Sequence, residues 1–375
     1  MNKMETVKKL IMLQVPTSIC NFRCHYCYLA QRDVSFQGEQ ANMQYSPEHV
    51  ARALSPKRLG GICFINACAE GETLLTNNID QYFKALVSEG HFLEIVTNMT
   101  VTPMIDKILS WETSLLSHIE FKCSFHYLEL KKRGLLEVFA NNVEKAWNAG
   151  ASYTIEIAPS DELIPFIDEV KEFSLKHFGA LPHLTITRDD TTKDIRKLTQ
   201  LSDNDYTNTW KIFNSEFWEY KAHIYGVKQE QFCYAGLWSI TVDIATGIAK
   251  KCYFNRLGNI FEDPNATLDL SPIGECPIAH CYNGHAFLTY GLIPGSAAPG
   301  YGDIRNRVRQ DGTEWLQPEL KAFFNTKLSD NNKEWSYHQK QKYLRAQMQQ
   351  TVGLRGKLSK YRFYQKLHKW KESLK

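Results

Sequence analysis

Short apolar segments alternate with longer segments of helical periodicity through the first half of the chain. The apolar segments lie at Leu10–Val15, Gly61–Ala67, Phe92–Thr97, Ile119–Phe125, Tyr153–Ala158 and His183–Thr187. The helical segments between them lie at roughly 47–54, 78–89, 103–111, 135–149 and 162–177. Alternation of this kind is typical of βα units around a parallel sheet. Six units predict an α/β fold, a partial (β/α)6 barrel, because a closed barrel of this type has eight strands.

The pattern changes after about residue 230. Two short apolar segments, Trp238–Ile244 and Ile248–Tyr253, flank an Ala-Thr-Gly turn and predict a β-hairpin, which Gly- and Pro-rich loops follow. Ser202 is expected to cap a helix that runs to about His223. We therefore predict a barrel over residues 1–230, a small hairpin and loop region over 231–302, and a helical C-terminal extension with a basic tail over 303–375.

The composition excludes several classes of protein. The chain has 375 residues but no run of about 20 apolar ones, the length that spans a bilayer, and its first residues lack a cleavable export signal. We therefore expect a cytoplasmic protein, and we expect no nucleic-acid partner. Its ten cysteines are not expected to form disulfides, because reducing compartments keep thiols free. Clustered cysteines in such a chain indicate metal binding instead.

Three cysteines cluster directly after the first apolar segment. Cys20, Cys24 and Cys27 stand in CNFRCHYC, a C-x3-C-x2-C spacing. Thiolates this close in one loop can bind three irons of a [4Fe–4S] cubane, which leaves the fourth iron open to a cofactor. The alternative is a zinc site, which normally takes four ligands and has only His25 as a nearby fourth.

The motif CNFRCHYC, with Tyr26 before its last cysteine, resembles that of the radical S-adenosylmethionine superfamily. Two further segments are similar to motifs of that superfamily: residues 70–73 stand in place of its GGEP segment, and residues 97–99 in place of its TNG segment. The resemblance implies a reduced cluster that cleaves S-adenosylmethionine to a 5′-deoxyadenosyl radical, which abstracts a hydrogen atom from the substrate. It also implies that Tyr26, Gly71, Glu72 and Asn98 bind the cofactor.

The fourth apolar segment carries a row of polar side chains. Strand alternation places Lys122, Ser124 and His126 on one face of the strand and the intervening residues on the other. The fourth strand of the superfamily commonly presents polar residues to the cofactor, so the resemblance assigns this row to the barrel interior. An ordinary half-buried strand is the alternative. Lys122, Ser124 and Arg188, at the end of the sixth segment, are then candidate cofactor contacts, and His126 is a candidate catalytic residue.

Four further cysteines form a second group. Cys233 and Cys252 flank the predicted hairpin turn in C-x13-G-x4-C, and Cys276 and Cys281 follow in CPIAHC. Four thiolates can saturate a second [4Fe–4S] cubane. The pattern resembles the twitch region of the same superfamily, a shortened relative of its SPASM domain. A structural zinc ion is the alternative, because the same four ligands would satisfy it.

The sequence predicts an enzyme without identifying its substrate. A saturated auxiliary cluster can accept an electron from a substrate radical, which favours oxidation. A redox-neutral epimerisation would instead need a thiol such as Cys68 or Cys123 as hydrogen donor. Because the first cysteine stands at residue 20, which leaves no domain before it for a peptide leader, we expect a sugar or polyol substrate. Modification of a ribosomally made peptide is the alternative, and a non-catalytic iron–sulfur electron carrier is a third. The enzyme would take electrons from an external donor such as a flavodoxin or ferredoxin.

The end of the chain is strongly basic. The formal net charge of the whole chain is +3, yet residues 353–375 contain eight Lys or Arg and a single Glu. Phe363, Leu367, Trp370 and Leu374 would share one face of a helix. Such a helix either docks on the barrel or lies on an anionic membrane with its apolar face in the headgroup region. A peripheral membrane contact is therefore one of two interpretations of this tail.

Overall fold

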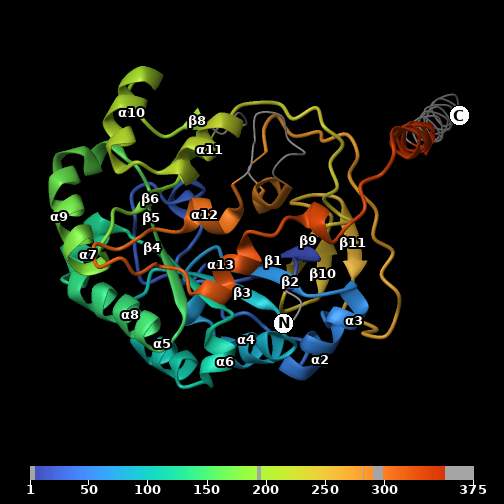
Figure 1. Ribbon diagram of the computed structural model, residues 1–375, viewed down its shortest axis with the longest axis horizontal. Coiled ribbons are helices and arrows are strands. Elements are labelled where there is room, and N and C mark those ends of the chain that lie inside the picture. Colours follow the sequence, from blue (N-terminus) through green and yellow to red (C-terminus); the bar gives the residue numbers. More distant parts are fainter. Residues whose placement is uncertain (1–4, 192–195, 282, 290–298, 351–375) are drawn as a thin grey trace, which may run out of the picture.

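The computed structural model describes residues 5–191, 196–281, 283–289 and 299–350. Its centre is a nine-stranded sheet in the order β11-β10-β9-β1-β2-β3-β4-β5-β6 (Figure 1). The strands are β1 Lys9–Val15, β2 Cys63–Ala69, β3 Phe92–Thr97, β4 Ile119–Ser124, β5 Ser152–Ile157, β6 His183–Leu184, β9 Ser239–Asp243, β10 Ile248–Lys250 and β11 Arg256–Asn259. Strands β1 to β6 pair in parallel in chain order. The predicted α/β fold with a partial (β/α)6 barrel is therefore confirmed.

The sixth strand is shorter than the sequence predicts. β6 ends at Leu184, and the chain then enters a separate two-stranded ribbon of β7 Arg188–Asp189 and β8 Arg196–Lys197. Arg188, expected at the end of the sixth strand, therefore begins this ribbon instead.

The strands are buried on both faces. In β1, Ile11, Leu13 and Val15 belong to the large apolar core on one face of the sheet. Leu10 and Met12 belong to a second apolar cluster on the other face. The near-continuous burial explains why the strands read as apolar runs, as is usual for parallel sheets covered on both sides.

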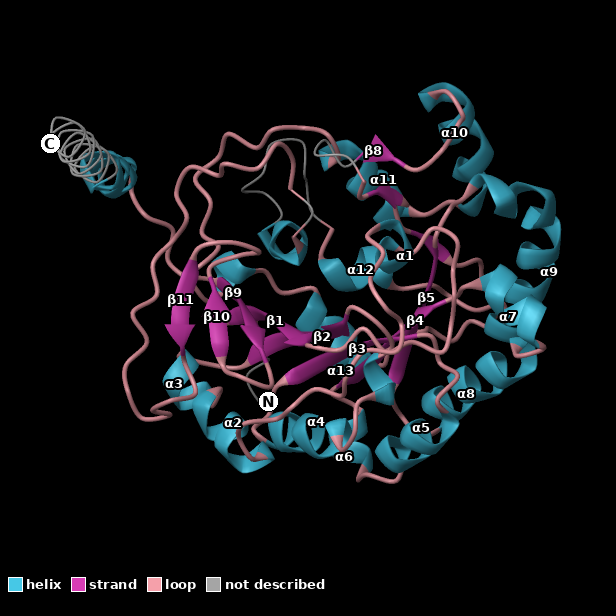
Figure 2. Ribbon diagram, turned by 180° about the vertical axis from the view of Figure 1, so that it is seen from behind, coloured by secondary structure: helices cyan, strands magenta, loops and turns pink. Residues whose placement is uncertain are grey.

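Helices cover the outer face of the sheet in an arc (Figure 2). They are α2 Pro47–Ala53, α3 Pro56–Leu59, α4 Ile79–Ser88, α5 Thr102–Leu109, α6 Thr113–Leu116, α7 Tyr127–Arg133, α8 Leu136–Asn148 and α9 Ile167–Phe178. In α4 the buried residues Ile79, Tyr82, Phe83 and Leu86 recur at the spacing of one helical face. The outer helices therefore bury an apolar stripe against the sheet.

The predicted hairpin is present, but its first strand belongs to the main sheet. β9 pairs in parallel with β1, with Ser239 opposite Leu10, and β10 pairs antiparallel with β9. The sheet therefore continues across the expected boundary at residue 231. Local sequence pattern predicts the two strands but carries no information on this distant pairing. The division into three domains stays a prediction.

The helix expected from Ser202 to His223 is interrupted. α10 Asp203–Trp210 begins after Ser202, whose hydroxyl accepts the backbone N–H of Asp205. Asn214 then adopts a φ of 48°, and α11 Glu216–Ile224 begins at a new cap, Ser215. Asparagine tolerates the left-handed conformation better than most residues, which is how the chain turns between the two helices.

The chain after residue 298 returns to the inner face of the sheet. α12 Tyr301–Arg305 and α13 Pro318–Phe324 supply aromatic side chains that pack on Phe64 and Phe92 in the second apolar cluster. A further helix covers residues 337–350. Residues 351–375, with all four apolar positions of the basic tail, lie outside the described residues, so both interpretations of that tail stay predictions. No described helix is both long enough and apolar enough to cross a membrane.

Candidate active site

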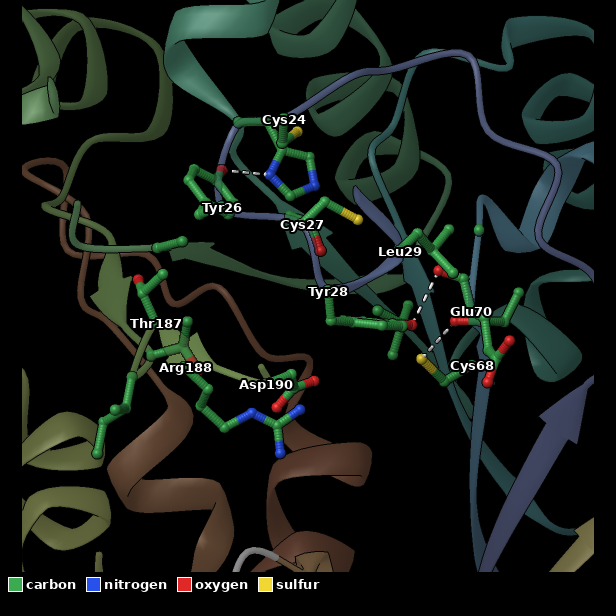
Figure 3. A pocket seen from close by; sticks show the side chains of 18 of the residues that line it. Cys24, Tyr26, Cys27, Tyr28, Leu29, Cys68, Glu70, Thr187, Arg188 and Asp190 are labelled. Carbon is green, nitrogen blue, oxygen red and sulfur yellow. Dashed lines mark hydrogen bonds between the residues drawn. The ribbon is translucent and has the colours of Figure 1, made fainter. Parts of the chain in front are cut away.

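A cavity of about 440 Å³ lies at the carboxyl ends of the parallel strands. Its wall comes from the loop after β1, the ends of β2 and β4, and the segment after β6, and Figure 3 shows side chains from these segments around one open space. Small-molecule sites typically measure about 300–1,000 Å³. Parallel α/β folds bind their ligands at this end of the strands. The position and size of the cavity are therefore those of a ligand site.

The first three cysteines line this cavity. Cys20, Cys24 and Cys27 lie in the loop after β1, and all are free thiols. The backbone N–H of Phe22 donates to Cys20 Sγ at 3.4 Å. Backbone amides in the short helix α1 Tyr28–Gln31 hydrogen-bond Cys27 and lower its thiol pKa, although burial outweighs them. Hydrogen bonds to sulfur tune bound iron–sulfur clusters, so the loop fits a cluster held at three corners.

Burial keeps these thiols from ionising on their own. It raises the pKa of Cys20 to about 11 and that of Cys24 further. A metal centre supplies the positive charge that ionises such thiols on binding. Among the described residues, no three His, Cys, Asp or Glu side chains lie close enough to hold one metal ion. The ligands of a cubane can lie farther apart than those of a single metal ion, because each thiolate binds a different iron.

Gly71 positions the cysteine loop over the end of β2. Its backbone N–H donates to Thr17 at 2.9 Å, and the N–H of Glu72 donates to Ile19 at 2.8 Å. A Cβ at position 71 would lie 2.1 Å from the Ile19 carbonyl oxygen. Only glycine allows the two backbone segments to approach this closely. Position 71 therefore requires glycine for packing, in addition to the cofactor role that the resemblance implies.

Glu72 is buried and does not line the cavity; its carboxylate connects neighbouring segments through hydrogen bonds. Its carboxylate accepts the Thr97 hydroxyl at 2.6 Å, the Leu74 N–H at 3.0 Å and the Asn98 N–H at 2.8 Å. Burial raises the pKa of Glu72 even though these three donors oppose the shift. The side chain thus joins the end of β2 to the end of β3.

Asn98 connects the third strand to the cysteine loop. Its amide donates to the Asn21 side chain at 2.7 Å, and Asn21 in turn donates to Thr100 at 2.8 Å. Met99 has a φ of 55°, a conformation that favours glycine. This explains why the TNG motif has glycine where this chain has Met99. Asn98 is buried and does not line the cavity.

Tyr26 and His126 meet in the cavity wall. The Tyr26 hydroxyl lies 2.7 Å from His126 Nδ1 (Figure 3). Burial lowers the pKa of His126 to about 4 and raises that of Tyr26 well above its usual value. Tyr26 is therefore the donor to a neutral imidazole. Ser124, the last residue of β4, also lines the cavity, whereas His126 lies two residues beyond that strand.

The opposite wall carries Arg188 and Asp190, which Figure 3 places across the open space from Cys27. Asp190 pairs with Arg32 at 2.7 Å. Gln31, which ends α1, donates to the Arg188 carbonyl at 3.0 Å and accepts the Asp190 N–H at 2.7 Å. These contacts fasten the end of the cysteine loop to the ribbon after β6.

The two candidate hydrogen donors lie in different places. Cys68 lines the cavity, and burial raises its pKa to about 11, so its thiol keeps its proton at neutral pH. Cys123 is fully buried in the core beneath the outer helices and does not line the cavity. Strand alternation turns Cys123 away from the face that carries Lys122 and Ser124. The structure therefore does not bring Cys123 to this site.

Lys122 belongs to a buried charged network behind the cavity. Its ammonium lies 3.2 Å from Glu156 and 3.7 Å from Glu94. Three more side chains complete the network: Glu120, Lys221 and Arg305. The acidic members stand at inward positions of β3, β4 and β5, a signal that the alternation rule would have detected. Lys221 and Arg305 come from α11 and α12, and no local pattern places them there.

The four cysteines of the second group line a second, smaller cavity. Asn283 donates its side-chain amide to Cys252 Sγ at 2.8 Å. Backbone amides hydrogen-bond Cys233 and Cys281 and lower the pKa of both thiols, although burial raises it more. Cys281 also lines the large cavity. The structure thus brings the predicted second group together, beside the first site.

Comparison with known proteins gives structural matches only. No family model and no curated protein matches the chain. Among solved structures, anSMEcpe with bound AdoMet (S-adenosylmethionine) is 16% identical with a TM-score of 0.48, and the match covers 69% of this chain and 77% of that one. Streptococcus suis SuiB bound to S-adenosylmethionine is 15% identical with a TM-score of 0.46, covering 69% and 64%. BtrN in complex with AdoMet and 2-DOIA is 17% identical with a TM-score of 0.35, covering 69% and 81%.

Proposed function

We propose that the chain is a radical S-adenosylmethionine enzyme that oxidises a sugar or polyol. The observation that carries the proposal is the placement of Cys20, Cys24 and Cys27 on the wall of a ligand-sized cavity at the carboxyl ends of the strands. Three thiolates leave one iron of a cubane open, and the cavity lies beside them. A structural zinc ion held by the same three thiolates would need a fourth protein ligand. The only nearby candidate, His25, instead contacts Glu162 at 2.8 Å and Ser160 at 3.1 Å.

In this proposal the cysteine loop holds the cluster and the surrounding wall holds S-adenosylmethionine. The bound pair supplies the hydrogen-abstracting 5′-deoxyadenosyl radical, and the protein supplies position. Glu70 and Gly71 on one wall and Arg188 on the other offer polar contacts to the cofactor. The hydrogen bond between Tyr26 and His126 holds the part of the cavity wall between these two sides in place. Glu72 and Asn98 act indirectly, because their side chains are engaged in bracing the loop.

The second group of cysteines supports oxidation as the type of reaction. Cys233, Cys252, Cys276 and Cys281 offer four thiolates, enough to saturate a [4Fe–4S] cluster that can take up an electron. Because Cys281 and Tyr253 line both cavities, such a cluster would adjoin the reaction space. Ser124, Thr185 and Lys221 line the large cavity and carry hydroxyl or ammonium groups, which favours a substrate rich in oxygen.

The decisive experiment is anaerobic reconstitution followed by reduction in the presence of S-adenosylmethionine. We expect close to eight irons per chain and formation of 5′-deoxyadenosine. Replacement of Cys20, Cys24 and Cys27 by alanine should remove about half of the iron and all cofactor cleavage. Cys123→Ala is the matched control, because Cys123 lies in the core away from the cavity. Cleavage that persists in the triple variant would refute the proposal, and zinc in place of iron would refute it for the second group.

Epimerisation is a second candidate, because a protonated thiol, Cys68, lines the cavity. A thiol that returns a hydrogen atom to the substrate carbon would introduce solvent deuterium there. Sugars, polyols and peptides screened for faster formation of 5′-deoxyadenosine would identify the substrate class. Deuterium in the recovered substrate, lost in Cys68→Ala, would then favour epimerisation, whereas a product two electrons more oxidised would favour dehydrogenation.

A further inference from the structure

Lys221 belongs both to the wall of the large cavity and to the buried charged network. The residue lies on α11 and lines the cavity. Its Nζ donates to Glu156 Oε2 at 2.7 Å and to Thr185 Oγ1 at 2.7 Å. These two acceptors fix the direction of the group. An ammonium has three N–H donors, so Lys221 can offer one more to a molecule in the cavity.

The network holds three cations and three acids, and Glu156 is the acid that pairs with Lys221. Glu156 is shared by three cations: Lys221 at 2.7 Å, Lys122 at 3.2 Å and Arg305 at 3.1 Å. The same three cations surround the ring of Phe217, at 4.1, 5.8 and 4.5 Å from its centroid. One carboxylate therefore faces three positive groups at the end of the network that meets the cavity.

The other acids of the network lie behind this end. Glu94 accepts the Tyr301 hydroxyl at 2.9 Å and lies 3.7 Å from Lys122. Glu120 lies 3.2 Å from Arg305 and is fully buried. Neither carboxylate lines the cavity. His183 is also buried there, and burial together with the charges of Arg305 and its neighbour Arg307 holds its pKa well below the usual value, so it is neutral.

We propose that Lys221 binds an anionic oxygen group of the substrate, a carboxylate or a phosphate, in the large cavity. The identification of that molecule as the substrate rests on the function proposed above, whereas the anion site itself does not. A bound anion would give Lys221, which pairs with Glu156, a second negative partner. It would also turn the remainder of the substrate toward the wall that carries the cysteines.

The charge states of the network give the site a defined pH dependence. Burial lowers the pKa of Lys221 to about 8, with Lys122 and Arg305 acting in the same direction and Glu156 against it. Burial and the charge of Glu94 raise the pKa of Glu120 to about 7. An anion favours the protonated form of each group, because protonation adds positive charge or removes negative charge. Binding should therefore be tightest below pH 7 and should weaken as the pH rises through 8.

Reconstituted full-length protein can be tested with three small probes by calorimetry. Gluconate carries a carboxylate, glycerol 3-phosphate carries a phosphate, and glycerol is the neutral control. We expect at least one anion to bind, its affinity to fall about tenfold in Lys221→Met, and glycerol not to bind. Lys132→Met is the matched control, because Lys132 is an exposed lysine away from the cavity. Binding by gluconate alone identifies a carboxylate site, and binding by glycerol 3-phosphate alone a phosphate site.

Reductive methylation with formaldehyde tests the same site without any substitution. At pH 8, Lys221 should be methylated readily, and the anion that binds should slow its methylation about tenfold relative to Lys132 in the same sample. No protection by either anion, or equal protection by glycerol, would overturn the proposal. Because 5′-deoxyadenosine formation is assayed separately on wild-type protein, loss of the anion site and failure of the proposed radical chemistry are distinguished.

Discussion

Gly71 lies against the carbonyl oxygen of Ile19, where the cysteine loop crosses the end of β2, and a Cβ at position 71 would come within 2.1 Å of that oxygen. The oxygen is part of the backbone, so the clash cannot be relieved by rotating a side chain. The loop that carries the first three cysteines therefore lies as close to the backbone at Gly71 as two backbone segments can approach.

Gly71→Ala should displace this loop and reduce the amount of iron that the proposed first cluster site binds. We expect a loss of up to half of the iron per chain, with the helical content by circular dichroism preserved, because the outer helices do not depend on the loop. Gly134→Ala is the control: an added Cβ there meets nothing within 4 Å, and only the left-handed backbone is strained, at a cost of about 1–2 kcal/mol. Full iron content in Gly71→Ala would contradict this account.

Glu72→Gln should destabilise the fold more than a surface substitution does. The carboxylate accepts three donors, and a glutamine amide would turn an NH2 group toward one of them. A buried donor without a partner costs about 1–3 kcal/mol, which thermal denaturation should reveal. Glu70→Gln, two residues earlier and exposed, should leave the melting temperature nearly unchanged. Equal melting temperatures for the two variants would show that the brace contributes little.

Asn283→Asp should make the reduction potential of the proposed second cluster more negative. The change retains the oxygen that accepts the His285 N–H at 2.8 Å but replaces the donor to Cys252 with an anionic oxygen. Loss of a hydrogen bond to sulfur, together with added negative charge, disfavours the reduced cluster. A redox titration followed by electron paramagnetic resonance would measure the shift, with the first cluster as internal reference. An unchanged potential would place Cys252 outside the cluster.

His91 should make the stability of the protein sensitive to mild acid. Its Nδ1 accepts the Cys63 N–H at 3.0 Å, and its Nε2 donates to the Leu54 carbonyl at 2.8 Å. Burial lowers its pKa from 6.5 to about 4. Between these values the unfolded chain binds a proton that the folded chain does not, so stability rises with pH across this window and is lost as the pH falls from 6.5 toward 4.

The variant His91→Gln should reduce that pH dependence, because glutamine does not titrate. The measurement is the free energy of unfolding in urea at pH 4.5 and 6.5 for both proteins. His91→Gln should be less stable than wild type at pH 6.5, with a smaller difference between the two pH values. The same slope in both proteins would show that His91 does not contribute.

The strands and the cysteine groups were predictable because both depend on short stretches of sequence. Each of β1 to β6 begins within two residues of its predicted start. A strand that is buried on both faces is a nearly continuous apolar segment, so it can be recognised in the sequence. The cysteines of each group come together because one loop, or one hairpin with the loop that follows, carries them.

The features that sequence missed are those that join distant segments. The pairing of β9 with β1 and the entry of Arg305 into the network with Glu120 and Glu156 depend on how the whole chain closes. The side chains of Glu72 and Asn98 hydrogen-bond neighbouring segments and do not line the cavity, so the cofactor contacts expected of them stay predictions. A sequence motif identifies the residue types at given positions, but tertiary packing determines which of those side chains line the cavity.

The place of β1 in the middle of the sheet has a consequence for biosynthesis. One edge of β1 pairs with β2, but the other edge stays unpaired until β9 has been synthesised. The paired residues Leu10 and Ser239 are about 230 positions apart in the sequence. At about 5–20 residues per second, the ribosome needs roughly 10–45 s to deliver β9. During that interval the nascent chain exposes an unpaired, apolar strand edge, the kind of surface that promotes aggregation and recruits chaperones. Recombinant yield should therefore depend on translation speed and chaperone supply, even where iron is plentiful.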